Sequence, residues 1–306
     1  MMMIDHARAK INLTLDIVGK RPDSYHELDM IMQTVEFSDA MVFETLDENR
    51  DPSAIEPGDV PVILELAGKC AGIPDGSDNL IIKAAGLLLP HARHLKTVRI
   101  GLDKHIPSGA GLGGGSADAA CAFRVLSAVW DCDLSRDELL SLAAKTGADV
   151  PFLIDGGCCR CRGIGEILDP VRGLYDVSIV LVKPKVSLST KEIYGLFDER
   201  GLPGRSDTPE CIKALNDENE SLAASLLGNA LEEAAMILYP AVNEIKSLLL
   251  DAGAMGASMT GSGSVVYGIF RDKRRAYAAT HRIREELGDA EIKTWITAPA
   301  SAENAP

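Results

Sequence analysis

The most constraining feature of this 306-residue sequence is a glycine-rich segment at residues 107–118, PSGAGLGGGSAD. It follows an alternating apolar stretch typical of a strand and precedes apolar residues at helical spacing. Glycines let a backbone approach a ligand closely and turn successive N–H groups inward, and a helix start adds unpaired N–H groups and a positive dipole end. The segment therefore predicts a phosphate-binding loop.

Other kinds of glycine loop fit this segment less well. Gly109, Gly111 and Gly114 satisfy G-x-G-x-x-G, but a dinucleotide-binding fold has this loop in its first strand-helix unit and an acidic residue after the next strand. Here a capped helix follows instead. The sequence also lacks the G-K-[ST] of a Walker A loop and the H-R-D and D-F-G motifs of protein kinases. A tight turn needs fewer than five glycines in seven positions, so we favour phosphate binding.

Composition and charge narrow the class of partner. Hydrophobic residues are 46% and charged residues 25% of the chain, as in ordinary globular proteins. The net charge of −14 repels polyanions, so we expect neither nucleic acid nor a membrane surface as a partner, although a loop and a helix terminus can still bind a small phosphate ligand.

The termini and the cysteines predict a cytoplasmic protein. Charged residues interrupt residues 1–20, so this segment resembles neither a signal peptide nor a transit peptide. The longest uncharged run, residues 252–270, contains five glycines, which is typical of loops and not of a membrane span. Seven cysteines cannot all pair within one chain, so we expect free thiols in a reducing compartment.

Periodicity and capping residues predict the remaining elements. We expect strands at residues 11–17, 28–35, 41–45, 62–66, 98–102, 177–182, 265–270 and 291–297. We expect helices capped by residues 77–79 and by residues 135–138, and further helices at residues 119–130, 190–197, 222–238, 241–252 and 273–287. Strands come together early and mix with helices later, so an α+β fold of two domains is favoured.

Several motifs resemble those of the GHMP kinases, which include galactokinase, homoserine, mevalonate and phosphomevalonate kinases. The glycine loop resembles their phosphate-binding motif, and residues 9–13 (AKINL) and 259–264 (MTGSGS) match an early and a late family motif. Residues 19–27 (GKRPDSYHE), 146–152 (TGADVPF) and 163–168 (GIGEIL) resemble one branch of the family, whose members phosphorylate an alcohol that carries a cytidine diphosphate moiety. The resemblance runs from about residue 7 to residue 270.

The resemblance implies a two-domain GHMP-kinase-like architecture and a chemistry. It implies an N-terminal mixed α/β domain at residues 1–168, a C-terminal α/β-sandwich domain at residues 169–298 and a flexible tail at residues 299–306. It also implies an ATP-dependent small-molecule kinase that uses Mg²⁺, with Asp149 as the base and Lys10 beside the transferring phosphoryl group. Taken alone, a loop aspartate is more often a cap or a solvated charge, and a strand lysine is usually solvated.

The binding residues are likewise implied by the resemblance. ATP is expected at Pro107, Ser108, Gly109, Ala110, Gly111, Leu112, Gly113, Gly114, Gly115, Ser116, Ala117 and Asn79. The acceptor is expected at Asn12, Tyr25, His26, Thr190, Thr260, Gly261 and Ser262. Within the second set, Tyr25 is expected to stack on the cytosine and His26 to hydrogen-bond it. The loop departs from the family at Ala117, where a second serine is common.

Three alternative functions stay open at this point. A related kinase acting on homoserine or mevalonate is disfavoured by the Tyr25-His26 pair, and a ligand-binding protein without activity is disfavoured by the presence of both Lys10 and Asp149. A dinucleotide-dependent oxidoreductase is disfavoured by the position of the glycine loop. The cysteines at 158, 159 and 161 lack a second ligand pair at zinc-site spacing, so we predict no bound metal there and a monomer or homodimer of thiol-bearing subunits.

Overall fold

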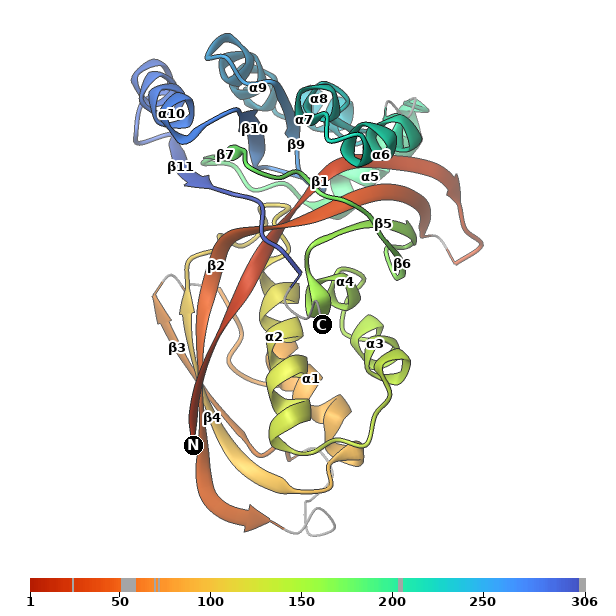
Figure 1. Ribbon diagram of the computed structural model, residues 1–306, viewed down its shortest axis with the longest axis vertical. Coiled ribbons are helices and arrows are strands. Elements are labelled where there is room, and N and C mark those ends of the chain that lie inside the picture. The colour runs from red at the N-terminus through yellow and green to blue at the C-terminus, as the bar shows by residue number, and fades with distance from the viewer. Residues whose placement is uncertain (24, 51–58, 69, 71, 203–205, 303–306) are drawn as a thin grey trace. The chain divides into compact units, whose positions relative to one another are not determined.

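The structure, a computed structural model, describes residues 1–23, 25–50, 59–68, 70, 72–202 and 206–302 (Figure 1). The chain divides into two compact units, each assembled from separate segments. Unit 1 comprises Met1–Ala9, Ser38–Ser108 and Gly113–Asp155, and unit 2 comprises Lys10–Phe37, Gly109–Leu112 and Gly156–Pro306. The domain boundaries expected at residues 168 and 298 stay predictions.

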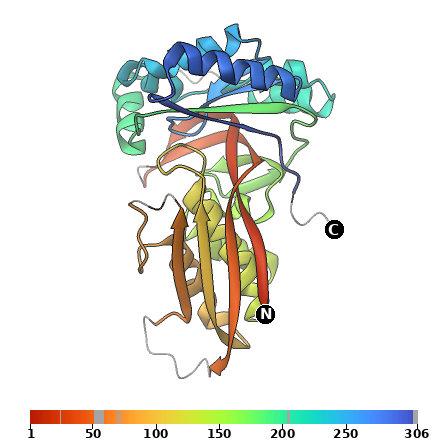
Figure 2. The same ribbon diagram turned by 90° about the vertical axis from the view of Figure 1, so that its left-hand side faces the viewer.

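Unit 1 is a sheet with helices on one side (Figure 2). Strand β4 (Leu95–Lys104) pairs antiparallel with residues 40–50 of β2 (His26–Arg50) and parallel with β3 (Val62–Gly68). The N-terminal part of β1 (Met2–Lys20) also belongs to this unit. The helices are α1 (Leu80–Leu88), α2 (Gly114–Val129), α3 (Arg136–Ala144) and α4 (Val150–Asp155), with the 3₁₀ turn η2 (Leu89–His91) after α1.

The caps predicted for α1 and α3 are confirmed. The Asn79 side chain accepts a hydrogen bond from the Ile81 N–H at 2.8 Å, and Pro90 lies in the 3₁₀ turn that ends the helix. Ser135 and Glu138 form a reciprocal capping box at the start of α3. The two strands expected at residues 28–35 and 41–45 are instead one continuous strand, β2, which contributes its first part to unit 2 and its second part to unit 1.

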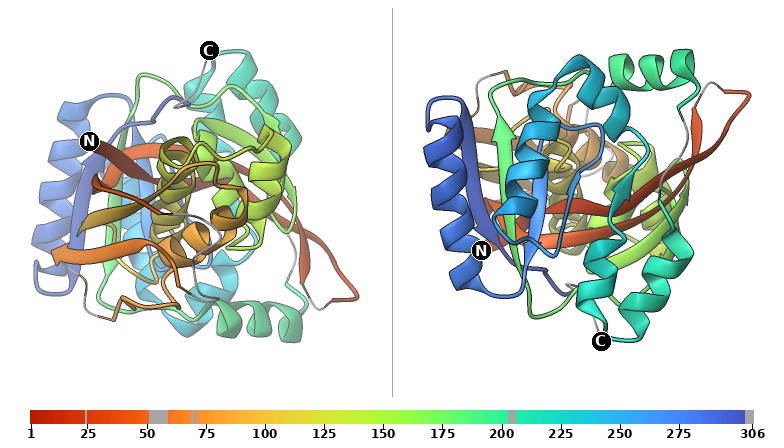
Figure 3. Two further views of the ribbon diagram at one scale, coloured as in Figure 1. Left: turned by 90° about the horizontal axis from the view of Figure 1, so that it is seen from below. Right: turned by 90° about the horizontal axis from the view of Figure 1, so that it is seen from above.

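Unit 2 contains a four-stranded antiparallel sheet in the order β11-β7-β10-β9. Its strands are β7 (Ser178–Pro184), β9 (Gly256–Met259), β10 (Val266–Phe270) and β11 (Ile292–Thr297). Helices α9 (Ala241–Asp251) and α10 (Lys273–Leu287) cover one face of it (Figure 3, right). The unit also contains α5 (Thr190–Arg200), α6 (Thr208–Asn216), α7 (Glu220–Ser225), α8 (Glu232–Leu238), β5 (Cys158–Gly163), β6 (Ile167–Pro170) and β8 (Gly228–Asn229).

The single helix expected at residues 222–238 was wrong. It is divided into α7 and α8 because Gly228 and Asn229 leave the helix and pair in parallel with Thr14 and Leu15 of β1. The Asn229 side chain accepts a hydrogen bond from the Leu231 N–H at 2.9 Å, immediately before α8 begins. Helical propensity alone did not reveal this strand pairing, and neither α6 nor β9 was expected.

The predicted tail is hydrogen-bonded over its first residues. The Ala300 N–H donates to the Thr34 carbonyl at 2.9 Å, and Ala302 forms a bridge with Gly156. Residues 303–306, residues 51–58 of the polar segment after β2 and Ser24 of the turn at residues 19–27 lie outside the described residues. In the described part of the chain, we find no helix with the length and apolarity needed to span a membrane.

Candidate functional site

The first half of the glycine loop, residues 109–112, belongs to unit 2 and has an alternating backbone. Gly109 and Gly111 have φ of 61° and 73°, and Gly113 follows with 70°. Alternation of left-handed and right-handed residues turns successive N–H groups into one concavity that attracts anions. The glycines are therefore required by the backbone conformation, as the sequence predicted.

The carbonyl groups of this half-loop are occupied by the protein. The carbonyls of Ala110, Gly111 and Leu112 each accept one hydrogen bond. The three donors are the Val265 N–H at 3.2 Å, the Thr260 hydroxyl at 3.0 Å and the Lys10 N–H at 3.0 Å. Because carbonyl oxygens repel phosphate, this pairing favours anion binding through the loop's N–H groups.

The contact between the two glycine motifs leaves no space for a side chain. A Cβ atom at Gly111 would lie 2.0 Å from the Thr260 carbonyl oxygen, a distance that only a backbone shift can relieve. A Cβ at Gly261 would lie 3.4 Å from the Lys10 ammonium. The glycine loop, the late motif at residues 259–264 and strand β1 therefore meet directly within unit 2.

Asn12 is the centre of this meeting point. Its Oδ1 atom accepts hydrogen bonds from the Lys10 ammonium at 2.7 Å and the Gly261 N–H at 2.9 Å, and lies 3.3 Å from the Thr260 hydroxyl. The Tyr267 hydroxyl donates to its backbone carbonyl at 2.7 Å. Lys10 is 4% exposed and Asn12 0%, so the amide of Asn12 holds Lys10 and the late motif in place. We call Lys10, Asn12, Thr260 and Gly261 the amide cluster.

The second half of the glycine loop belongs to unit 1 and leads into α2. Gly113 precedes the helix in a left-handed conformation, and the Ala117 N–H donates to its carbonyl at 2.8 Å. The N–H groups of the first turn of a helix have no partner within the helix, a feature typical of anion-binding sites. Ala117 is 2% exposed, so its side chain packs in the protein and the missing second serine leaves Ser116 as the hydroxyl of this turn.

A buried group of three charged side chains supports this half-loop, and the sequence did not reveal it. The Lys104 ammonium binds Asp118 of α2 at 2.7 Å and also binds Asp39 of β2. Asp39 also accepts hydrogen bonds from two backbone N–H groups, those of His105 and Ile106. A Cβ at Gly114 would lie 3.1 Å from the Lys104 ammonium, so this charged cluster lies directly behind the loop.

The charged cluster contains two carboxyl groups and one ammonium group. Burial raises the pKa of Asp118 to about 8, the Lys104 ammonium opposes that rise and the Asp39 carboxylate adds to it. The pKa of Lys104 is also raised, because its two carboxyl partners outweigh the opposing effect of burial. Burial therefore favours the protonated form of Asp118, while the Lys104 ammonium favours its carboxylate form.

Asp149 lies immediately before α4, close in unit 1 to the start of α2. Its side chain is half-buried, and its carbonyl accepts a hydrogen bond from the Leu153 N–H at 3.1 Å, which begins the helix. A Cβ at Gly147 would lie 3.7 Å from the Ser116 hydroxyl. The segment that presents Asp149 therefore lies against the first turn after the glycine loop.

The residues expected at the cytosine end lie together in unit 2. Tyr25 is 61% exposed, and the His26 ring stacks on the Tyr194 ring with centroids 4.7 Å apart. The His26 Nε2 atom lies 2.7 Å from the Asp198 carboxylate. Tyr194 and Asp198 both belong to α5 and were missed, because no local pattern links them to a loop far away in sequence.

Two further residues expected at the site, Thr190 and Asn79, have partners of different kinds. The Thr190 hydroxyl lies 2.8 Å from the Ser262 hydroxyl, so these two acceptor-site residues are brought together. Asn79 is 6% exposed, and its side-chain oxygen caps α1 while its amide donates to the Pro74 carbonyl at 2.7 Å. Both ends of that side chain thus have partners within the protein, and its expected contact with ATP stays a prediction.

The cysteines are free thiols, and three of them line β5. Burial raises the pKa of Cys159 to about 11 and that of Cys158 well above its usual value, so these thiols stay protonated. Over the described ranges, no group of three or more His, Cys, Asp or Glu side chains is arranged to hold a metal ion.

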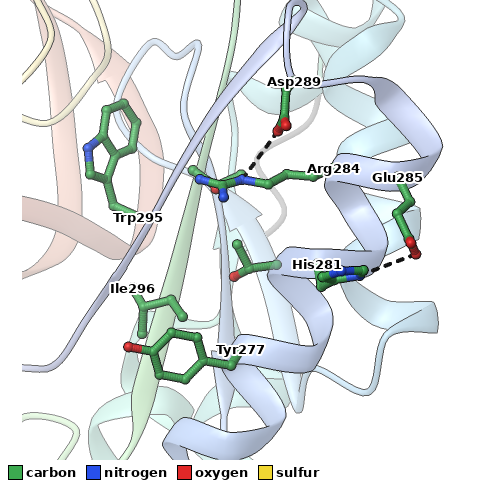
Figure 4. Close-up of a pocket in the computed structure, with 9 residues that line it drawn as sticks. Tyr277, His281, Arg284, Glu285, Asp289, Trp295 and Ile296 are labelled. Atoms are coloured by element: carbon green, nitrogen blue, oxygen red, sulfur yellow. Dashed lines mark ion pairs between the residues drawn. The ribbon is translucent and has the colours of Figure 1, made fainter.

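A pocket of about 640 Å³ lies between α10 and β11 (Figure 4). Tyr277, Trp295 and Ile296 supply its apolar wall, and Arg284 pairs with Asp289 at 3.5 Å. None of the residues expected to bind ATP or the acceptor lines this pocket.

Comparison with known proteins decides the family. The GHMP kinases N terminal domain matches residues 79–157, and the GHMP kinases C terminal domain matches residues 210–289. A 4-diphosphocytidyl-2-C-methyl-D-erythritol kinase of Pelotomaculum thermopropionicum is 41% identical over 282 residues, which cover 92% of this chain and 94% of that protein. The chain belongs to the GHMP kinase family.

Solved structures of GHMP kinases agree with the fold. A crystal structure of 4-(cytidine 5'-diphospho)-2C-methyl-D-erythritol kinase is similar with a TM-score of 0.77 and 30% identity, and the match covers 98% of this chain and all of that one. A homoserine kinase of Cytophaga hutchinsonii has a TM-score of 0.74 at 17% identity, over 99% of this chain and 96% of its own, and shows the shared fold alone. The predicted two-domain α+β GHMP kinase fold is confirmed, and the chain is a small-molecule kinase whose family uses ATP as phosphoryl donor.

Proposed function

We propose that this GHMP kinase transfers the γ-phosphoryl group of ATP to the 2-hydroxyl of 4-diphosphocytidyl-2-C-methyl-D-erythritol, a step of non-mevalonate isoprenoid precursor biosynthesis. The observation that carries the proposal is the similarity to a kinase of that name over nearly the whole length of both chains. The Tyr25-His26 pair supports it, because an exposed aromatic ring beside a histidine suits a nucleobase.

Phosphoryl transfer depends mainly on alignment and charge neutralisation, and it needs an acceptor for the hydroxyl proton. We assign the proton to the Asp149 carboxylate as the 2-hydroxyl oxygen attacks the γ-phosphorus. The bond from that phosphorus to the bridging oxygen breaks, and ADP leaves. Lys10 supplies positive charge to the transferring group, and the N–H groups of the glycine loop bind the remaining phosphate oxygens.

We place the magnesium ion of the proposed reaction at the start of α2. Mg²⁺ takes one or two protein oxygens together with phosphate oxygens and water, and it neutralises charge on the phosphates when bound. The Ser116 hydroxyl, in the first turn after the glycine loop, is the oxygen that would hold it. Asp118 does not suit this role, because its carboxyl group is buried against Lys104.

The acceptor distinguishes this proposal from its alternatives. ADP release by the purified protein is measured with the diphosphocytidyl acceptor, homoserine and mevalonate in turn, each with ATP and Mg²⁺. We expect turnover with the first alone. Comparable turnover on homoserine would assign the chain to a different branch of the family, and no ADP release with any acceptor would favour a binding protein without activity.

A further inference from the structure

One face of α5 joins the two ends of the expected acceptor site. Thr190, Tyr194 and Asp198 follow one another at four-residue spacing, so they form a stripe along the helix about 12 Å long. Thr190 contacts Ser262 of the late glycine motif, and Asp198 contacts His26. A stripe of this length spans from the phosphate end to the base end of a nucleoside diphosphate.

Asp198 is held as an ionised acceptor by two donors. Its Oδ2 atom binds the Lys20 ammonium at 2.5 Å, and its Oδ1 atom binds His26 Nε2 at 2.7 Å. Hydrogen bonds from Lys20 and then from His26 lower the pKa of Asp198. An ionised carboxylate only accepts hydrogen bonds, so Nε2 is the protonated nitrogen of His26.

The tautomer of His26 follows from this contact. A neutral imidazole with a proton on Nε2 has its lone pair on Nδ1, which then accepts hydrogen bonds. The stacking of the ring on Tyr194, at an interplanar angle of 30°, fixes the plane in which that lone pair lies. The position of the proton is thus set by Asp198 and the orientation of the ring by Tyr194.

We propose that Asp198 is a positioning residue that selects cytosine over uracil by keeping His26 Nδ1 as an acceptor. This inference rests on the proposed function. Cytosine presents an amino donor at C4, whereas uracil presents a carbonyl acceptor there. An acceptor facing an acceptor leaves both groups unpaired, and sites of this kind discriminate strongly.

The experiment compares the cytidine acceptor with its uridine analogue in four proteins: the wild type, Asp198→Asn, Asp198→Ala and Glu199→Gln. Glu199 is the exposed neighbour on the same helix, so its variant removes the same charge without the contact to His26. We expect the wild type to prefer cytidine by more than about tenfold in kcat/KM, one lost hydrogen bond being worth about that factor. Asp198→Asn should reduce the preference most, because its amide can donate to Nε2 and move the proton to Nδ1.

Binding measurements separate this inference from the proposed function. CDP and UDP are titrated into each protein by calorimetry, and the imidazole ¹⁵N shifts of His26 report which nitrogen carries the proton. A selectivity for CDP that disappears in both Asp198 variants, with ATP KM and melting temperature as in Glu199→Gln, supports the inference even if the methylerythritol acceptor is not turned over. An unchanged cytidine preference in both Asp198 variants, or a wild-type His26 with its proton on Nδ1, would overturn it without contradicting the proposed kinase activity.

Discussion

The two halves of the glycine loop are supported by different physical means. Residues 109–112 are held by the amide cluster, in which uncharged groups make most of the contacts. The backbones pack so closely there that no side chain fits at Gly111. Residues 113–117 are supported by the charged cluster of Lys104, Asp39 and Asp118, whose stability depends on contacts between buried titratable groups. One glycine loop thus has a sterically determined half and an electrostatically determined half, and substitutions in the two halves should have different consequences.

The largest effect on activity is expected when the proposed general base is removed and both clusters that support the glycine loop are kept. Asp149→Asn keeps size and hydrogen bonding but removes the proposed proton acceptor, so we expect kcat to fall by about 10²–10⁴-fold, the usual contribution of a general base. ATP affinity should change little, because both halves of the loop proposed to bind the nucleotide are left intact. Steady-state kinetics and nucleotide calorimetry measure the two quantities.

Lys10→Met is the matching change in unit 2. If Lys10 and Asp149 act together in the phosphoryl transfer, the double variant should be scarcely slower than either single variant. Retention of more than about a tenth of kcat in Asp149→Asn, a loss below the general-base range, would show that Asp149 is not the base.

The next largest effect tests the steric half of the loop. Gly111→Ala puts a Cβ against a backbone carbonyl at 2.0 Å and into a left-handed conformation, so we expect a loss of several kcal/mol, enough to abolish soluble protein. Gly114→Ala meets only side-chain atoms, at 2.8 Å and 3.1 Å, and Gly114 lies outside the left-handed region, so side-chain movement can relieve the contact. The melting temperature of Gly114→Ala should change much less than that of Gly111→Ala. A larger loss in Gly114→Ala would contradict the assignment of the steric constraint to the first half of the loop.

A smaller effect is expected from the centre of the amide cluster. Asn12→Ala removes an acceptor from the Lys10 ammonium and from the buried Gly261 N–H, and leaving that N–H unsatisfied costs about 1–3 kcal/mol. Because Lys10 loses a positioning contact, kcat should fall as well as the melting temperature. Asn243→Ala, an exposed position on α9, is the control. A variant that is destabilised but retains full kcat would show that Asn12 supports the fold alone.

The smallest effect at neutral pH, and the most pH-dependent, is expected from the charged cluster. The folded-state pKa of Asp118, about 8, lies above the unfolded value near 3.8, so between these values the folded state holds a proton that the unfolded state has released. Wild-type stability is therefore lost as pH rises through this range. Asp118→Asn mimics the protonated acid and lacks this loss.

Melting temperatures of wild type and Asp118→Asn at pH 5, 7 and 8.5 test this sign. We expect the melting temperature of Asp118→Asn to rise relative to that of the wild type as pH rises. A difference that is constant with pH, or that moves the other way, would show that Asp118 is ionised in the folded protein throughout.

The sequence was sufficient wherever a feature is local. The glycine loop, the Asn79 cap and the capping box at Ser135 depend on residues a few positions apart, and each was predicted in place. Alternation along β1 also placed Lys10 and Asn12 on the same side of the strand, as their 2.7 Å contact requires.

Long-range pairings were beyond the reach of such patterns. Lys104 binds Asp39, which lies 65 residues away in sequence, and His26 binds Asp198, which lies 172 residues away. No sequence periodicity predicts a buried ion pair or a histidine partner at such a separation. The break between α7 and α8 was missed for the same reason, because it depends on pairing with β1. Tertiary contacts override local propensity at these positions.

The central claim is that this chain phosphorylates one particular hydroxyl of one acceptor, and the position of the new phosphate tests it most directly. The wild type is incubated with ATP, Mg²⁺ and the diphosphocytidyl acceptor, with Asp149→Asn as the blank, and the product is examined by ³¹P and ¹H–³¹P correlation NMR. The account predicts one new phosphomonoester on the 2-hydroxyl, formed together with ADP and absent from the blank over the same time. A phosphate on another hydroxyl, or ADP formed without any new ester, would contradict it.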